Sequence, residues 1–139
     1  MTMPFQITFS QRQHYDSLKS GVTVETVLRR GETAINCTAK IDTGSHVCLF
    51  EREIGEYLGL NIESGQRLEL GTLTGSLTAY GHEITLETLG LTFDTFVYFP
   101  QLDNVRRNIL GRHGWLQLVR LGIVDYDSEL YLSPYSDSP

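Results

Sequence analysis

The chain has 139 residues, which fits one compact domain with its own hydrophobic core and leaves little room for a second. Apolar residues make up 40% of the chain and charged residues 20%, a composition typical of a folded globular protein. The formal net charge of −6 argues against a nucleic-acid partner, because phosphate binding needs clustered Lys and Arg. The adjacent basic residues at 29–30 and 106–107 are interpreted as solvated turns.

The sequence gives no signal for a membrane, a metal or a secretory route. No apolar run approaches the roughly 20 residues needed to span a bilayer. Residues 1–6 lack the basic and apolar regions of a secretion signal, so we expect a cytoplasmic protein with no membrane partner. Cys37 and Cys48 fit this expectation as small buried apolar side chains, and a disulfide between them is possible but not suggested by their spacing. The four histidines are scattered, so we expect no metal site.

In the first half of the chain, apolar and polar residues mostly alternate with a period of two, which predicts strands. We expect these strands at residues 5–9, 22–28, 34–41 and 47–50. Residues 11–20 are polar and are interpreted as a connector, and the Arg-Arg-Gly-Glu sequence at 29–32 as a hairpin turn. Residues 51–60 have apolar side chains at helical spacing and end near Gly59, which predicts a short helix.

The second half of the chain predicts further hairpins. Residues 67–70 and 77–80 flank a stretch rich in Gly and Thr at 71–76, which predicts a long hairpin with a flexible tip. Two more pairs of strands are expected, at residues 83–89 with 92–99 and 122–126 with 129–132.

One segment of the second half has a different period. Residues 112–121 place Trp115, Leu118 and Val119 at helical spacing, which predicts a second short helix ended by Gly122. The chain has no low-complexity segment and no linker-like stretch. The pattern as a whole therefore predicts a single all-β domain with two short helices.

The motif that can carry chemistry is Asp42-Thr43-Gly44-Ser45, which lies between two apolar strands. Burying a lone carboxylate is costly, so a carboxylate in this setting needs either a partner or a function. The ordinary alternative is a surface turn, because Asp and Gly are both common turn residues. Taken alone, the motif leaves both interpretations open.

A second motif follows late in the chain, after a polar loop: two apolar residues, then Gly and Arg, at Ile109, Leu110, Gly111 and Arg112. In this order, the two motifs and the hairpin between them resemble the retropepsin-like aspartic proteases over roughly residues 20–133. The resemblance implies a closed β-barrel or sandwich with a flap hairpin and one or two short helices. It also implies three parts: an N-terminal arm or edge strand at 1–20, the protease domain at 21–133 and a frayed tail at 134–139.

The resemblance also implies roles for individual residues. Asp42 matches the catalytic aspartate, and Thr43 the threonine whose hydroxyl bonds across the two-fold axis of the dimer. Gly44 matches the glycine that lets the substrate backbone lie close to the loop. Ser45 matches a position where a serine can donate a hydrogen bond to the catalytic carboxylate. The tip of the flap, which closes over bound peptide, is matched by Leu73, Thr74, Gly75 and Ser76.

Such an enzyme needs two copies of this chain. Peptide hydrolysis needs a base to activate water and an acid to protonate the departing nitrogen. Two carboxylates about 3 Å apart supply both, because they cannot both ionise and so share one proton. The chain has one Asp-Thr-Gly, so we expect a homodimer that brings Asp42 from each subunit to the two-fold axis. The implied activity is an aspartic endopeptidase acting on polypeptides, with no metal or organic cofactor.

One residue departs from the family pattern. His46 stands where retroviral members have an acidic residue, so Arg112, which is retained, lacks its usual carboxylate partner. Either Arg112 pairs with another acid, such as Asp125 or Asp127, or strands hold a weaker dimer. Two alternatives therefore stay open. One is a catalytically silent module of the same fold that serves dimerisation or peptide binding, and the other is an unrelated β-barrel binding protein with a chance motif.

Overall fold

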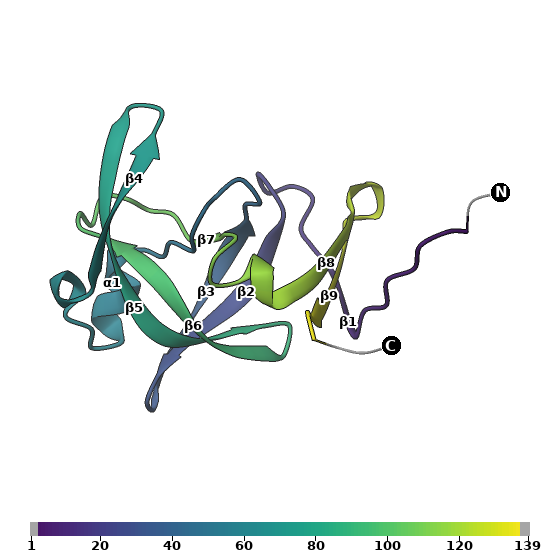
Figure 1. Cartoon of the computed structure of the whole chain (residues 1–139), viewed down its shortest axis with the longest axis horizontal. Coiled ribbons are helices and arrows are strands. Elements are labelled where there is room, and N and C mark those ends of the chain that lie inside the picture. Colours follow the sequence, from purple (N-terminus) through teal and green to yellow (C-terminus); the bar gives the residue numbers. More distant parts are fainter. Residues whose placement is uncertain (1–2, 137–139) are drawn as a thin grey trace.

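The computed structural model describes residues 3–136. Figure 1 shows a body built mostly of β-sheet, from which a long hairpin at residues 66–80 projects upwards, a second hairpin at residues 23–41 points downwards, and the N-terminal segment extends to the right. The strands are β1 (Gln11–His14), β2 (Thr23–Arg30), β3 (Thr33–Ile41), β4 (Gln66–Thr72), β5 (Gly75–Thr88), β6 (Leu91–Pro100), β7 (Ile109–Leu110), β8 (Val119–Val124) and β9 (Glu129–Pro134). The helical elements are α1 (Arg52–Tyr57) and the 3₁₀ turns η1 (Ile62–Ser64), η2 (Leu116–Leu118) and η3 (Asp125–Asp127).

The strands form two sheets. The larger sheet has the order β4-β5-β2-β3-β7, with β6 also paired to β5, and the smaller has the order β1-β9-β8. The β3–β7 pair is parallel, with Lys40 opposite Ile109 and Ile41 opposite Leu110. This parallel pair matters for the site, because β3 ends directly before Asp42 and β7 directly before Gly111.

A continuous core lies between the sheets and α1. Its largest fully buried side chains include Trp115, Phe50 and Phe99. The indole nitrogen of Trp115 donates to the buried Thr88 hydroxyl at 3.0 Å, so the one polar atom of this side chain is satisfied inside the core. A smaller apolar cluster joins the segment after the Asp-Thr-Gly-Ser loop to the base of the projecting hairpin, through Val47, Leu49, Ala79 and Tyr98.

The predicted all-β fold and its four hairpins are confirmed. The turn between β5 and β6 shows why, because Leu89 and Gly90 have φ values of 48° and 78°, a geometry suited to tight two-residue hairpins. Helix α1 is also confirmed, and it stops before Gly59, whose φ of +81° no helical residue adopts. The long strand β5 was expected as two separate pieces, but it runs unbroken from the projecting hairpin into the core.

The strand predicted at residues 5–9 was wrong. Residues 5–9 form no strand, and the polar stretch interpreted as a connector contains β1, which pairs with β9. Alternation alone does not make a strand, because a strand also needs a partner edge. Phe5 is 99% exposed, whereas Phe9 packs against Tyr131 at 5.7 Å between ring centroids. At the other end, β9 reaches Pro134, inside the predicted tail of 134–139, and residues 137–139 lie outside the described part.

The predicted helix at residues 112–121 was also wrong. Gly114 has a φ of +104°, which no helical residue adopts, and only the turn η2 follows it. Val119 already pairs with Pro134 as the first residue of β8. Of the apolar residues that suggested a helix, Trp115 and Val119 are buried and Leu118 is half-buried, but they lie in a turn and a strand.

Three further observations bear on the expectations from composition. Both cysteines are free, and burial, as the largest cause, raises the pKa of each thiol to about 12. Among residues 3–136, no helix has the length and apolar character needed to cross a bilayer. Within the same residues, no group of three or more His, Cys, Asp and Glu is placed to hold a metal ion.

Candidate active site

The backbone around Asp42 is held by β7 on one side. The Asp42 amide donates to the Leu110 carbonyl at 3.0 Å, which continues the parallel β3–β7 pairing into the loop. The chain then turns, and the Ser45 amide donates back to the Asp42 carbonyl at 3.1 Å. The side chain of Asp42 is fixed by its own loop, since its Oδ1 accepts a hydrogen bond from the Gly44 amide at 2.9 Å. Asp42 is half-buried, whereas Thr43 and Gly44 are exposed in the single chain.

Gly111 explains why the second motif contains a glycine. A Cβ at this position would lie 2.1 Å from the Val47 carbonyl oxygen and 2.9 Å from the Ser45 carbonyl oxygen. Both atoms belong to the backbone of the segment that carries Asp42, so no side chain fits between the two segments. The glycine is therefore required for the close approach of the two motifs.

Beyond Gly111, the two segments form a short ladder. The Arg112 amide donates to the Ser45 carbonyl and the His113 amide to the His46 carbonyl, each at 2.9 Å. At Gly111 itself, the amide lies 3.3 Å from the sulfur of Cys48, a buried residue that follows the Asp-Thr-Gly-Ser loop. The structure thus brings together the two motifs that the sequence placed almost 70 residues apart.

The predicted contact of Ser45 is corrected by the structure. We expected its hydroxyl to donate to the Asp42 carboxylate, but it donates to the Val47 carbonyl at 2.7 Å. A hydroxyl has one proton to give, so Ser45 supports the end of the loop and not the carboxylate.

The predicted partners of Arg112 are also not found. Among residues 3–136, Arg112 makes no ion pair with Asp125 or Asp127, and Asp125 instead accepts a hydrogen bond from the Tyr15 hydroxyl. His46, the residue after Ser45, packs edge-on against His113, with ring centroids 4.3 Å apart. Sequence reasoning missed His113, because only the hydrogen bond from its amide to the His46 carbonyl brings it beside the loop of Asp42.

The residues predicted to form the tip of a flap lie in the projecting hairpin of β4 and β5. Its pairing runs from Gln66 opposite Gly81 to Thr72 opposite Gly75, which leaves Leu73 and Thr74 as the turn. The Thr72 hydroxyl donates to the Gly75 carbonyl at 3.0 Å and closes that turn. Leu73 is fully exposed at the tip. Figure 1 shows this hairpin extending beyond the body of the domain.

A hollow of about 520 Å³ lies elsewhere on the chain, between the β2–β3 turn and the β5–β6 pair. Charged residues of both signs line it, including Arg29, Glu83 and Asp94, and Asp42 is not among its lining residues. We assign it no part in the site, because the two motifs meet elsewhere.

No protein-family model and no curated protein sequence matches this chain. Solved structures do match it. A retropepsin-like aspartic protease from Rickettsia conorii is 16% identical, with a TM-score of 0.57, over 80% of this chain and 89% of that one. The EIAV protease, solved with the inhibitor HBY-793, is 17% identical, with a TM-score of 0.51, over 76% of this chain and 88% of that one. At these identities the similarity establishes the fold, and the predicted retropepsin-like architecture is confirmed.

Proposed function

We propose that this chain, which has the retropepsin-like fold, is one subunit of a homodimeric aspartic endopeptidase with Asp42 as its catalytic residue. One observation carries the proposal. The half-buried Asp42 is held by the Gly44 amide in a loop that is fastened to the Gly111 segment from both sides. A loop fixed in this way presents one carboxylate in a set direction, which is what a two-carboxylate site requires of each half.

The second carboxylate would come from a second copy. Within residues 3–136, Asp42 has no hydrogen bond to another carboxyl group, so this chain alone does not form the pair. A two-fold axis beside the exposed Thr43 and Gly44 would bring two Asp42 side chains together. Each Thr43 hydroxyl would then bond to the opposite loop and fix the spacing of the pair.

In the proposed reaction the two carboxyl groups share one proton. The ionised Asp42 takes a proton from a water molecule, which attacks the carbonyl carbon of the substrate peptide bond. The protonated Asp42 donates to the developing oxyanion, and proton transfer then releases the amine. This chemistry requires neither a metal nor an organic cofactor. The β4–β5 hairpin would close over the substrate, with its backbone contacting the peptide and excluding water.

A second function is favoured by the residues around Arg112. A catalytically silent dimerisation or peptide-binding module of the same fold would not need the acidic residue that His46 replaces. The His46–His113 contact fits such a module, and so does the lack, within residues 3–136, of an ion pair between Arg112 and Asp125 or Asp127. They leave the loop that holds Asp42 intact, so the endopeptidase is the function better supported.

The two functions differ in one assay. Purified protein is incubated with unfolded polypeptides from acidic to neutral pH, beside the Asp42→Asn variant, and peptide products are measured by mass spectrometry. Asn has nearly the same shape but cannot supply the shared proton, so the endopeptidase loses its activity while its circular dichroism is unchanged. Cleavage by the wild type that persists in Asp42→Asn would show that another group is responsible. Peptide binding without cleavage would identify the silent module.

A further inference from the structure

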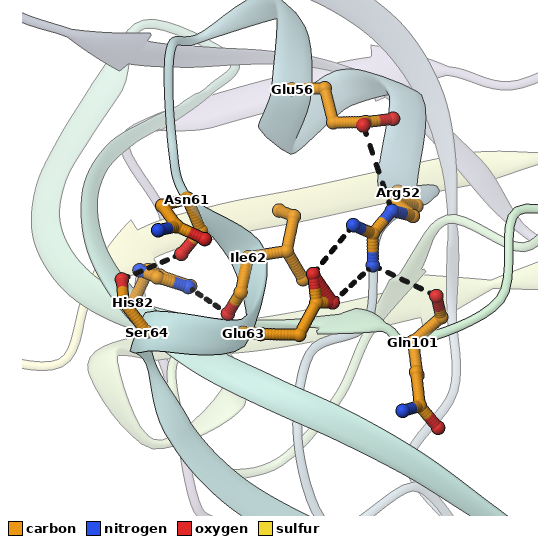
Figure 2. A network of polar contacts seen from close by, with 8 residues as sticks. All are labelled: Arg52, Glu56, Asn61, Ile62, Glu63, Ser64, His82 and Gln101. Carbon is orange, nitrogen blue, oxygen red and sulfur yellow. Dashed lines mark hydrogen bonds and ion pairs between the residues drawn. The ribbon is translucent and has the colours of Figure 1, made fainter.

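Arg52 makes three charge-assisted hydrogen bonds from the start of α1. Its guanidinium binds both carboxylate oxygens of Glu63, at 2.6 and 2.7 Å, and donates to the Gln101 carbonyl at 2.8 Å. Glu56, one turn along α1, lies 3.7 Å away. Figure 2 shows the guanidinium between these groups. The Glu63 contacts raise the pKa of Arg52 and lower the pKa of Glu63.

Of the two main partners of Arg52, one shortly precedes β4 and the other is hydrogen-bonded to β5, so both strands of the projecting hairpin are connected to it. Glu63 lies in η1, three residues before β4 begins at Gln66. Gln101 follows β6, and its amide donates to the Thr78 carbonyl on β5 at 2.9 Å. A single guanidinium therefore connects the approach to β4 with the strand that supports β5.

This connection lies where the hairpin leaves the sheet. Strand β6 pairs with β5 from Ala79, opposite Pro100, inward, and the Gln101–Thr78 bond extends this support by one residue. From Thr78 to the tip at Gly75, β5 has only β4 as its partner strand. A two-stranded ribbon has little stability of its own, so its motion depends on how firmly its base is held.

The remaining contacts at the base are closely packed. The His82 ring, on β5, hydrogen-bonds through Nε2 to the Ile62 carbonyl at 2.8 Å, as Figure 2 shows. A Cβ on Gly65 would lie 2.4 Å from the Gly81 carbonyl oxygen, and a Cβ on Gly81 would lie 2.2 Å from the Phe96 ring. These contacts pack the start of β4 against β5 and β5 against β6, while Arg52 is the charged group that joins this base to α1 and Gln101.

We propose that Arg52 is a positioning residue for the hairpin: by holding Glu63 and the Gln101 carbonyl, it fixes the base of the ribbon and confines motion to its outer part. The effect of this on substrate turnover depends on the proposed function, whereas its effect on the hairpin does not. A bidentate guanidinium sets direction as well as distance, so Lys cannot replace it.

The test compares Arg52→Gln with Arg106→Gln. Arg106 is a matched control, because it pairs with Glu51 and Glu53 beside the same helix, at 3.7 and 3.9 Å, and neither of these ion pairs involves a residue of the hairpin. Hydrogen–deuterium exchange is measured by mass spectrometry. For Arg52→Gln we expect amides of residues 66–78 to exchange about five- to tenfold faster, with the β2–β3 amides unchanged. Arg106→Gln is expected to change neither region.

Two further variants keep the test decisive. Arg52→Lys retains the charge, and we expect it to show the same hairpin-specific increase even if Arg52→Gln does not fold. In the double variant Arg52→Gln with Glu63→Gln, exchange should be no faster than in Arg52→Gln alone, because both changes break the same contact. Equal acceleration of β2–β3 and the hairpin, or no acceleration of the hairpin, would overturn the proposal.

Kinetics separate this proposal from the proposed function. If the wild type cleaves peptides, Arg52→Gln should raise KM about tenfold and change kcat much less, since the hairpin would hold substrate less firmly. If the wild type cleaves nothing, the exchange result still decides the role of Arg52 in the hairpin. An unchanged KM together with faster hairpin exchange would show that Arg52 has no part in catalysis but does hold the base of the hairpin.

Discussion

Gly111→Ala tests the account of how the two motifs are joined. A Cβ essentially never lies closer than 3.0 Å to such a neighbour, yet here it would lie 2.1 Å from the Val47 carbonyl oxygen. The opposing atoms are backbone, so the segment carrying Asp42 must move by about 1 Å to make room. We expect a loss of about 3 kcal/mol in the free energy of unfolding, at the upper end for overpacking.

Two measurements check this prediction. For a chain of this length, the loss corresponds to a fall of about 10 °C in Tm, measured by circular dichroism. Peptide hydrolysis should fall by about 100-fold even at temperatures where the variant is folded, because the displaced loop misdirects Asp42. Gly71→Ala is the matched control for stability, since nothing lies within 4 Å of a Cβ there and its φ is ordinary; activity is compared with the wild type, because Gly71 belongs to the hairpin proposed to close over substrate. If Gly111→Ala were as stable as Gly71→Ala and as active as the wild type, the close approach would have no role.

Three other changes give separate expectations. Ser45→Ala removes the hydrogen bond to the Val47 carbonyl and should lower the free energy of unfolding by about 1 kcal/mol, while the pH–activity profile keeps its shape. A displaced profile would mean that the Ser45 hydroxyl acts on the Asp42 carboxylate after all. The hydrogen bond to Asp125 raises the pKa of Tyr15 from 10.0 to about 12, so its contribution to stability is complete below pH 10 and is lost as pH rises towards 12. Urea unfolding should show this alkaline loss in the wild type and a smaller one in Tyr15→Phe. Gly75→Val forces a branched side chain to a φ of +144° and should lower turnover more than Tm, whereas equal losses would make Gly75 an ordinary turn residue.

The hairpins could be predicted because each combines local signals that agree. In β5 and β6 the alternation of apolar residues and the turn at Gly90 point to the same pairing. The helix predicted around Trp115 failed because ten residues with apolar side chains three and four apart also fit a turn followed by a strand. The strand predicted at residues 5–9 failed because the edge of β9 is taken by β1, which alternation cannot reveal.

The site was predictable in outline and not in its contacts. The order of the motifs indicated the fold, and the hydrogen bond from the Asp42 amide to the Leu110 carbonyl shows that the two motifs lie side by side. Their side-chain partners depend on directions that only the folded chain sets. The hydroxyl of Ser45 therefore binds a carbonyl and not the carboxylate. For the same reason, the contact between His46 and His113 could not be read from the sequence.

Subunit mixing tests the central claim most directly, namely that two Asp42 side chains form one active site. Wild-type and Asp42→Asn chains are mixed in equal amounts, exchange is shown by native mass spectrometry, and peptide hydrolysis is measured per wild-type chain. About a quarter of the dimers then keep both aspartates, so activity per wild-type chain should fall to about half of its unmixed value. Activity that stays strictly proportional to the wild-type chain after demonstrated exchange would mean that each chain works alone, and the shared pair would be contradicted.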